Sequence, residues 1–332
     1  MHSNSKINLP TIHQKVISHD NHIYELIEVL GEGGYGTVFK CIDETRKKYA
    51  LKVEKLEQTA LKIEIYVLHR LNEKKCRHFC KMIDWGNEEP DYMFMVMTLL
   101  GADLSKLRSQ MPLRRFSLGT ALRLAMQTAN ALQELHTCGF ISRDVKPGNF
   151  AHGINECTKL IYMVDFGLAR KYMDKNMHII PERMGIGWRG TIRYGSLRAH
   201  AKQDLARKDD LESWIYMVIE FTKGVLPWRL ITDRTRVQIE KEKARTENRE
   251  MFLSGCPPCF NKLLSIIDVL QYPDEPPYQQ IISTLIECCN QNHVQMKEKY
   301  DWETENVPTQ PASSMSTTET ETALESPHIP VN

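Results

Sequence analysis

The chain has 332 residues, of which 42% are hydrophobic and 26% charged, enough to form one large globular domain or two lobes. The net charge of +1 gives no reason to expect nucleic acid as a partner. The polar start predicts no secretory signal, and apolar runs fall short of the roughly 20 residues that span a membrane, so we expect no membrane association.

The N-terminal part is predicted to be rich in strands. Residues 1–20 are polar and read as a flexible leader. Residues 38–42 and 49–53 are β-branched or aromatic and predict a strand pair, and residues 91–98 predict another strand. Apolar residues at helical spacing predict a helix over residues 57–71.

The rest of the chain is predicted to be helical. Ser117 can cap a long amphipathic helix that ends near Gly139, and residues 211–221 are apolar on nearly every side, which is typical of a buried helix. Strands followed by helices indicate an α+β fold with two lobes. We place the smaller lobe at 21–98, a hinge at 98–102, the larger lobe at 103–300 and a disordered acidic tail at 301–332.

A glycine motif, Gly31, Gly33 and Gly36 followed by Val38, has the spacing of a phosphate-binding loop. Glycines let backbone amides approach phosphate oxygens closely. The same GxGxxG spacing occurs in dinucleotide-binding folds, where a helix follows directly. Here β-branched and aromatic residues follow, so we expect a strand and a phosphate-binding hairpin; alone, the motif could also be a plain glycine-rich hairpin.

Lys52 lies sixteen residues after Gly36, on the next predicted strand. A lysine there can reach the α- and β-phosphates of a nucleotide, and Glu64 in the following helix is the expected ion-pair partner. Most single lysines and glutamates are merely solvated, so this assignment depends on the glycine motif beside it.

The strongest signal is the segment 141–150, which reads ISRDVKPGNF. It places Asp144 to accept a proton from a substrate hydroxyl, Lys146 to neutralise a transferring phosphoryl group and Asn149 to bind magnesium. Asp165, in Asp-Phe-Gly twenty-one residues after Asp144, is the second predicted magnesium ligand. Phosphoryl transfer depends on positioning and charge neutralisation, which these few groups can supply.

These motifs resemble the protein kinase superfamily over about residues 22–298. Segments 189–200, 208–213 and 226–229 are most similar to the casein kinase 1 group and its tau-tubulin-kinase-like branch, in which a segment like 196–200 replaces Ala-Pro-Glu. The resemblance implies a two-lobed protein kinase fold and magnesium-dependent phosphorylation of serine or threonine with ATP.

The resemblance also implies individual site residues. Met97 would be the gatekeeper, the backbone at Leu100 would bind the adenine edge, and Thr191 would brace Asp144. The complete set of expected ATP-binding residues is Gly31, Gly33, Gly36, Val38, Ala50, Lys52, Glu64, Met97 and Leu100.

Two residues depart from the family pattern. Ser142 stands where the family has a structural histidine, and Gly195 stands where many relatives have alanine. Neither change removes a catalytic charge, so we favour an active enzyme. The alternative is a pseudokinase scaffold that binds nucleotide or a partner without turnover, and Ser142 is the feature that supports it.

The expected partners are protein substrates that are acidic or already phosphorylated. Arg189 and Arg193 lie beside the predicted substrate loop, and arginine forks suit phosphate. Arg229, Arg234 and Arg236 further along could equally be solvated. The tail carries six acidic residues and no Lys or Arg, and we hypothesise that it docks on the basic face and inhibits. We expect a monomer, as is common for kinase domains.

The nine cysteines are scattered along the chain, which favours free thiols in a reducing compartment, the cytoplasm and also the nucleus. Cys256 and Cys259 have CxxC spacing, but no second pair accompanies them, so a four-ligand zinc site is not expected.

Overall fold

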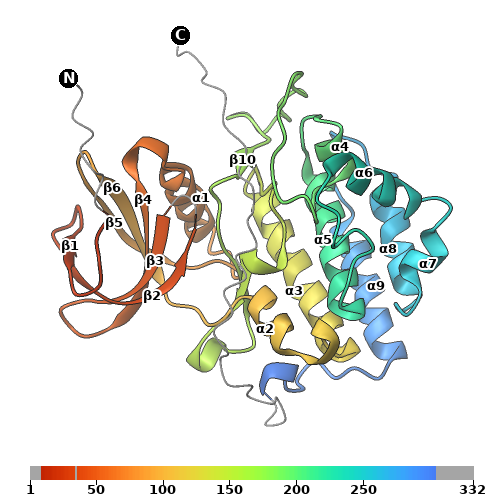
Figure 1. The fold of residues 1–332 in the computed structure, drawn as a ribbon, viewed down its shortest axis with the longest axis horizontal. Coiled ribbons are helices and arrows are strands. Elements are labelled where there is room, and N and C mark those ends of the chain that lie inside the picture. The colour runs from red at the N-terminus through yellow and green to blue at the C-terminus, as the bar shows by residue number, and fades with distance from the viewer. Residues whose placement is uncertain (1–8, 34–35, 304–332) are drawn as a thin grey trace.

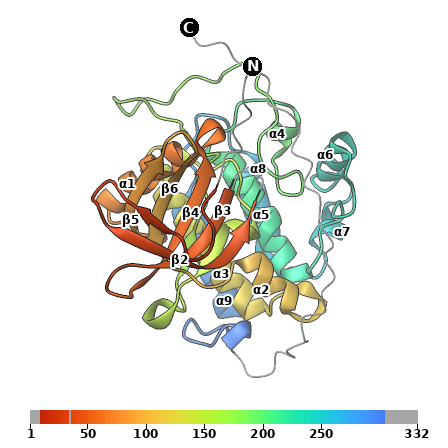
Figure 2. The ribbon, with the colours of Figure 1, turned by 60° about the vertical axis from the view of Figure 1, so that its left-hand side comes forward.

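The computed structural model describes residues 9–33 and 36–303. An N-terminal antiparallel sheet and a larger helical part lie side by side (Figure 1), and Figure 2 turns the sheet toward the viewer. The predicted α+β organisation is therefore confirmed. The main sheet has the order β1-β2-β3-β4-β6-β5. Its strands are β1 (Lys15–Ile17), β2 (Ile23–Glu32), β3 (Gly36–Ile42), β4 (Lys48–Lys55), β5 (Met82–Glu88) and β6 (Tyr92–Thr98).

The predicted pairing of β3 with β4 is confirmed, and its register sets one face of the sheet. Val38 lies opposite Lys52, and Ala50 lies opposite Met97. Because directly paired residues share a face and side chains alternate along a strand, these four side chains lie on the same face.

The helix predicted from residue 57 begins later, since α1 spans Leu61–Glu73. Residues 56–58 form a short 3-10 turn, and Thr59 is extended. The buried Glu54 carboxylate accepts the Ala60 N–H at 2.8 Å and the Thr59 hydroxyl at 3.2 Å. These bonds turn the chain just before the helix, which the apolar periodicity could not indicate.

Part of the predicted leader is structured, so that prediction was wrong for its second half. Strand β1 pairs with β2, and Val16 is 3% exposed because it packs in the core of the sheet. Leu9 packs against the same core. The strand has only two apolar residues, Val16 and Ile17, which is too few to predict it from the sequence. The first eight residues of the predicted leader lie outside the described part.

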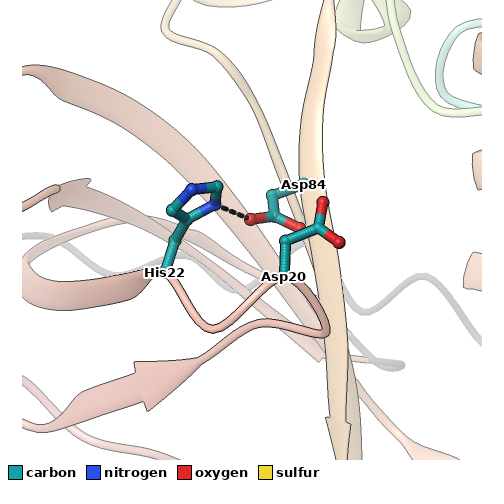
Figure 3. A group of neighbouring side chains, drawn as sticks. All are labelled: Asp20, His22 and Asp84. Atoms are coloured by element: carbon teal, nitrogen blue, oxygen red, sulfur yellow. Dashed lines mark hydrogen bonds and ion pairs between the residues drawn. The ribbon is translucent and has the colours of Figure 1, made fainter.

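A polar contact fastens the β1–β2 turn to β5. The His22 imidazole contacts the buried Asp84 carboxylate at 2.8 Å, and Asp20 lies beside both (Figure 3). The hydroxyl of Tyr24 also donates to Asp84, at 3.2 Å. Among the described residues this is the one group of three potential metal ligands, and its hydrogen bonds give it a structural role without a metal.

The larger part is organised around one buried helix. Helix α5 (Arg207–Lys223) is buried along residues 209–221, as predicted for 211–221. Figure 1 shows it between α3 and α8. Ser117 caps α3 (Leu118–Thr137) by accepting the Thr120 N–H, which confirms the predicted cap. The other helices are α2 (Leu104–Gln110), α4 (Leu197–His200), α6 (Arg234–Lys243), α7 (Arg249–Leu253), α8 (Cys259–Asp268) and α9 (Tyr278–Gln291).

Short strands surround the loops between α3 and α4. Strand β7 (Phe140–Ile141) pairs with β10 (Arg170–Lys171), and β8 (Phe150–His152) pairs with β9 (Ile161–Met163). These two ribbons bracket residues 142–149 and 164–169. No helix in the described part of the chain is long and apolar enough to cross a membrane.

The first three residues of the predicted disordered tail are ordered. Residues 301–303 form a 3-10 turn in which the Asp301 carboxylate accepts bonds from the Ser117 N–H and hydroxyl, both at 2.6 Å, and from the Thr120 hydroxyl at 2.8 Å. The Trp302 ring stacks on Tyr300 at 4.5 Å. The boundary between the larger lobe and the tail was therefore predicted at least three residues too early. The hypothesis that the tail inhibits concerns residues 304–332, which lie outside the described part.

Candidate active site

Lys52 on β4 contacts three carboxylates. Its ammonium lies 2.6 Å from Glu64 on α1, 3.3 Å from Glu54 and 3.4 Å from Asp165. Burial alone would lower the pKa of Lys52, but Glu64, Asp165 and Glu54 outweigh it and raise this pKa. Lys52 is thus held as a charged group between the sheet, α1 and the larger part.

Glu54 was missed by the sequence analysis. It follows Lys52 by two residues on β4, so the period of the strand places both side chains on one face. That spacing was the available signal. Glu54 links the ammonium of Lys52 to the backbone at the start of α1.

Asp144 is held by two groups that the sequence analysis named. The Thr191 hydroxyl donates to Asp144 Oδ1 at 2.7 Å, and Lys146 Nζ lies 3.0 Å from Asp144 Oδ2. Lys146 also donates to the Thr191 hydroxyl oxygen at 3.2 Å. The structure thus brings a carboxylate, a cation and a hydroxyl from two distant segments into one cluster, and the expected brace of Asp144 is present.

Asn149 and Asp165 offer oxygen ligands of the kind that magnesium prefers. Asn149 Nδ2 donates to the Asp144 carbonyl oxygen at 2.9 Å, which turns the amide nitrogen away and leaves its oxygen as the ligand atom. Burial raises the pKa of Asp165, but Lys52, the Gly167 N–H and Lys146 together lower it, so Asp165 is ionised. These donors fit a magnesium ion. Asp165 also has a φ of 62°, a strained value that occurs preferentially at functional sites.

The glycines of the motif differ in what they permit. A Cβ at Gly31 would have no neighbour within 4 Å, which leaves room for a ligand. A Cβ at Gly36 would lie 1.8 Å from the Val53 carbonyl oxygen, so Gly36 is needed for the close approach of β3 to β4. The Gly33 N–H bonds the Gly36 carbonyl at 2.9 Å, which tightens the loop. As predicted, a strand follows, whereas residues 34–35 lie outside the described part.

The adenine-binding residues expected from the resemblance lie along the sheet and the hinge. Val38, Ala50 and Met97 share the sheet face that carries Lys52. Leu100 lies between β6 and α2, and its neighbour Gly101 is fixed by a bond from its N–H to the His152 carbonyl at 2.9 Å. The expected adenine-binding residues and Lys52 therefore lie on one face of the sheet and in the segment that follows it.

The loop that carries Asp144 is hydrogen-bonded to Asp210 on α5, a residue that was not predicted from the sequence. Asp210 accepts the N–H groups of Ser142 at 2.7 Å and Arg143 at 2.8 Å. It also contacts His136 Nε2 at 2.9 Å. Ser142 itself is 2% exposed, and its hydroxyl oxygen accepts the Asp144 N–H at 3.3 Å. The loop is therefore anchored although Ser142 replaces the family histidine.

The segment 166–188 contains no Ser or Thr. Its two arginines are neutralised by the buried carboxylate of Asp204, which lies outside the segment. Asp204 pairs with Arg170 at 2.5 Å and with Arg183 at 3.0 Å. Arg143 lies near both, and burial followed by repulsion from Arg189, Arg170 and Arg183 lowers its pKa to about 10. Sequence reasoning missed Asp204 because its partners are distant in the chain.

The predicted substrate-binding arginines lie in different surroundings. Arg189 is exposed, whereas Arg193 extends toward the buried Glu220, 3.9 Å away. Arg234 lies over the Trp188 ring at 5.5 Å, which places this helix residue beside the substrate loop. Arg236 on the same helix is exposed. Arg189 is therefore accessible to an anionic substrate, whereas Arg193 already faces an internal carboxylate.

Gly195 accommodates the indole of Trp188. A Cβ at position 195 would lie 2.7 Å from Trp188 Cη2, closer than real contacts allow. Trp188 Nε1 donates to the Gly190 carbonyl at 3.0 Å, which fixes the ring. The departure at Gly195 from the alanine of many relatives thus has a packing reason.

A family model described as protein kinase domain matches residues 24–298, most of the chain. The chain belongs to the protein kinase family. The sheet and the helical part of this kinase are accordingly the two lobes predicted from the sequence.

The kinase is similar to several curated proteins. Serine/threonine-protein kinase spe-6 of Caenorhabditis elegans is 36% identical over 302 residues, which are 87% of this chain and 78% of the relative. A Dictyostelium discoideum protein named as a serine/threonine-protein kinase is 36% identical over 284 residues, 84% of this chain and 56% of that protein. A C. elegans protein named as a casein kinase I is 33% identical over 286 residues, with 83% and 82% covered.

Proposed function

We propose that the chain is an active serine/threonine protein kinase that transfers the γ-phosphoryl group of ATP to protein hydroxyls. The observation that carries this proposal is the cluster of Asp144, Lys146 and Thr191, with Asp144 held at 2.7 Å by the Thr191 hydroxyl. Lys52 lies 3.4 Å from Asp165, and the charge of Lys146 helps to lower the pKa of Asp165, so the two groups of residues adjoin. A nucleotide between them would meet a fixed cation on one side and a fixed base on the other.

The residues have distinct tasks in the transfer. Lys52 neutralises the α- and β-phosphates, and its ion pair with Glu64 keeps it in place. The substrate hydroxyl oxygen forms a bond to the γ-phosphorus while the bond to the β–γ bridging oxygen breaks, and the proton passes to Asp144. Lys146 neutralises the charge on the transferring group. Asn149 and Asp165 would hold magnesium, which supplies further charge neutralisation at the phosphates.

The finer assignment is to the casein kinase 1 group, with acidic or phosphorylated protein substrates. It is supported by the motifs at 189–200, 208–213 and 226–229 and by the similarity to a protein named as a casein kinase I. The exposed Arg189 supports the substrate preference. Asp204 supports activity without a phosphorylated activation segment, because it already neutralises Arg170 and Arg183.

The test is phosphorylation of casein with magnesium and ATP by the wild type, D144N, K52M and the control K55M. Lys55 is exposed on the same strand as Lys52, so K55M controls for loss of a lysine from β4. D144N and K52M are each expected to lower kcat/KM at least about 100-fold, and K55M less than about twofold.

Thermal stabilisation by ATP separates an active kinase from a scaffold. Saturation at 100 times the Kd stabilises either one by about 2.7 kcal/mol. Stabilisation without phosphate transfer by the wild type would refute the proposal and make the pseudokinase scaffold the better description.

A further inference from the structure

The substrate loop, residues 189–196, rests on helix α6 through one buried lysine. Lys241 is 0% exposed. Its ammonium donates to the carbonyl oxygens of Ile192 at 2.8 Å and Gly195 at 2.6 Å, and it contacts His200 Nε2 at 3.1 Å. A single side-chain amino group therefore donates to both ends of the turn between Ile192 and Gly195.

Burial lowers the pKa of Lys241 well below its ordinary value, with Glu212 opposing this effect, so the groups that contact its amino group decide how it is held. Its ammonium lies 5.0 Å from the centre of the Tyr216 ring and 5.4 Å from that of Trp228, and aromatic faces attract cations. Burial, together with the charges of Lys241 and Arg234, lowers the pKa of His200 to about 3. His200 is therefore neutral and can accept a hydrogen bond from the ammonium.

The burial of Lys241 is costly and calls for a specific benefit. Transferring an ammonium group from water to the interior costs roughly several kcal/mol unless its N–H groups form hydrogen bonds. A methionine would fill a similar volume without that cost. What the ammonium alone provides here is a donor for two carbonyl oxygens of the substrate loop. The Trp228 indole adds a third bond, from Nε1 to the Arg193 carbonyl at 2.8 Å.

The anchored turn is directly joined to the catalytic cluster. Thr191, whose hydroxyl holds Asp144, immediately precedes Ile192, and its carbonyl accepts the Gly195 N–H at 2.8 Å. We propose that Lys241 is a positioning residue that fixes the substrate loop and, through Thr191, the orientation of Asp144 for protein substrates. This inference rests on the proposed kinase function for its kinetic consequence, but its structural part does not.

The experiment compares the wild type with K241M, K241Q and K243M in the full-length chain. K241M removes the donors, K241Q keeps an amide N–H donor without charge, and K243M changes a partly exposed lysine on the same helix. Three quantities are measured for each: amide hydrogen exchange in residues 191–196, kcat and KM for casein, and the Kd for ATP.

K241M is expected to lose protection in the loop and at least about tenfold in kcat/KM for casein, because two buried carbonyls lose their partner. Its Kd for ATP should stay within about twofold of the wild type, since the nucleotide binds elsewhere. K241Q should recover loop protection and most of the casein activity, and K243M should match the wild type.

The outcomes separate this inference from the proposed function. If the wild type transfers no phosphate, the proposed function fails, and hydrogen exchange in K241M still decides whether Lys241 anchors the loop. Wild-type exchange and kinetics in K241M would overturn the inference, as would an equal loss of ATP binding, which indicates general damage. If K241M fails to fold, K241Q decides, and failure of both to fold also counts against a positioning role.

Discussion

His22 is an exposed residue whose charge is coupled to a buried carboxylate. The hydrogen bond to Asp84 is the largest of the effects that raise the pKa of His22. Burial raises the pKa of Asp84, but bonds from Ser18, His22 and the Trp85 N–H outweigh it and lower that pKa. Each group thus favours the charged form of the other in the folded chain.

This coupling gives a predicted pH dependence of stability. A raised histidine pKa stabilises the fold below the unfolded pKa of about 6.5, and the effect disappears as pH rises through the higher folded value. The lowered pKa of Asp84 stabilises the fold only above its unfolded value of about 3.9. The Tm difference between the wild type and H22A should therefore be largest between roughly pH 4.5 and 6 and decrease on both sides.

The matched control is H69A, which removes another exposed histidine that pairs with a carboxylate. Its Tm difference should lack the maximum shown by H22A, because its partner Glu73 is exposed and hydrated. A Tm difference for H22A that does not change from pH 5 to 9 would contradict the coupling to Asp84.

The sequence predicted single residues well where a local motif carries the chemistry. Lys52, Asp144, Asn149 and Asp165 are found together as their motifs suggested. Asp210 and Lys241 could not be predicted, since each acts on the backbone of a segment at least 46 residues away. Such pairs carry no signature in local spacing, because any donor and acceptor of suitable reach would serve.

Residues 166–188, the activation segment of this kinase, are held by ion pairs with Asp204. Asp204 is 1% exposed and lies between Arg170 and Arg183, near the half-buried Arg143. In D204N the side chain keeps its shape but loses its charge, so three guanidinium groups repel one another. We expect a loss of about 2 kcal/mol in the free energy of unfolding, because one partner of a largely buried ion pair is removed.

Urea denaturation measures the stability of D204N, and casein phosphorylation measures its activity, which should fall with the order of the segment. E156Q is the control, since it neutralises a carboxylate that is exposed. D204N with the stability and activity of the wild type would show that the arginines need no internal anion.

At the level of elements, regular structure was predicted better than its ends. The periodicity of α3 and α5 follows directly from apolar burial, so both were found. The start of α1 was placed four residues early because the Glu54 carboxylate, not periodicity, determines where that helix begins. Strand β1 was missed because an edge strand needs few apolar residues once a neighbour provides its hydrogen bonds.

For the whole molecule, Asp301 joins two segments that are 181 to 184 residues apart in the chain. It accepts bonds from Ser117 and Thr120 at the start of α3, the helix that leads to the catalytic loop. We predict that D301A lowers the free energy of unfolding by about 1–2 kcal/mol through loss of these bonds.

Chemical denaturation of D301A, with E287Q as the control, tests this prediction. Glu287 is an exposed carboxylate on α9, so E287Q should leave the denaturation midpoint unchanged. Equal midpoints for D301A and the wild type would show that residues 301–303 add nothing to the larger lobe. The compositional prediction failed at these residues because composition cannot distinguish a solvated carboxylate from one that caps a helix.

The contact between Trp188 and Gly195 couples the substrate loop to the residue that precedes it. An alanine Cβ at 195 would lie 2.7 Å from the end of the Trp188 indole, so the ring would have to shift to admit that common family residue. A smaller side chain at position 188 would remove this conflict but leave a void beside His200, whose ring lies 4.9 Å from the indole. The two positions are therefore coupled, because the cost of an alanine at 195 depends on the side chain at 188.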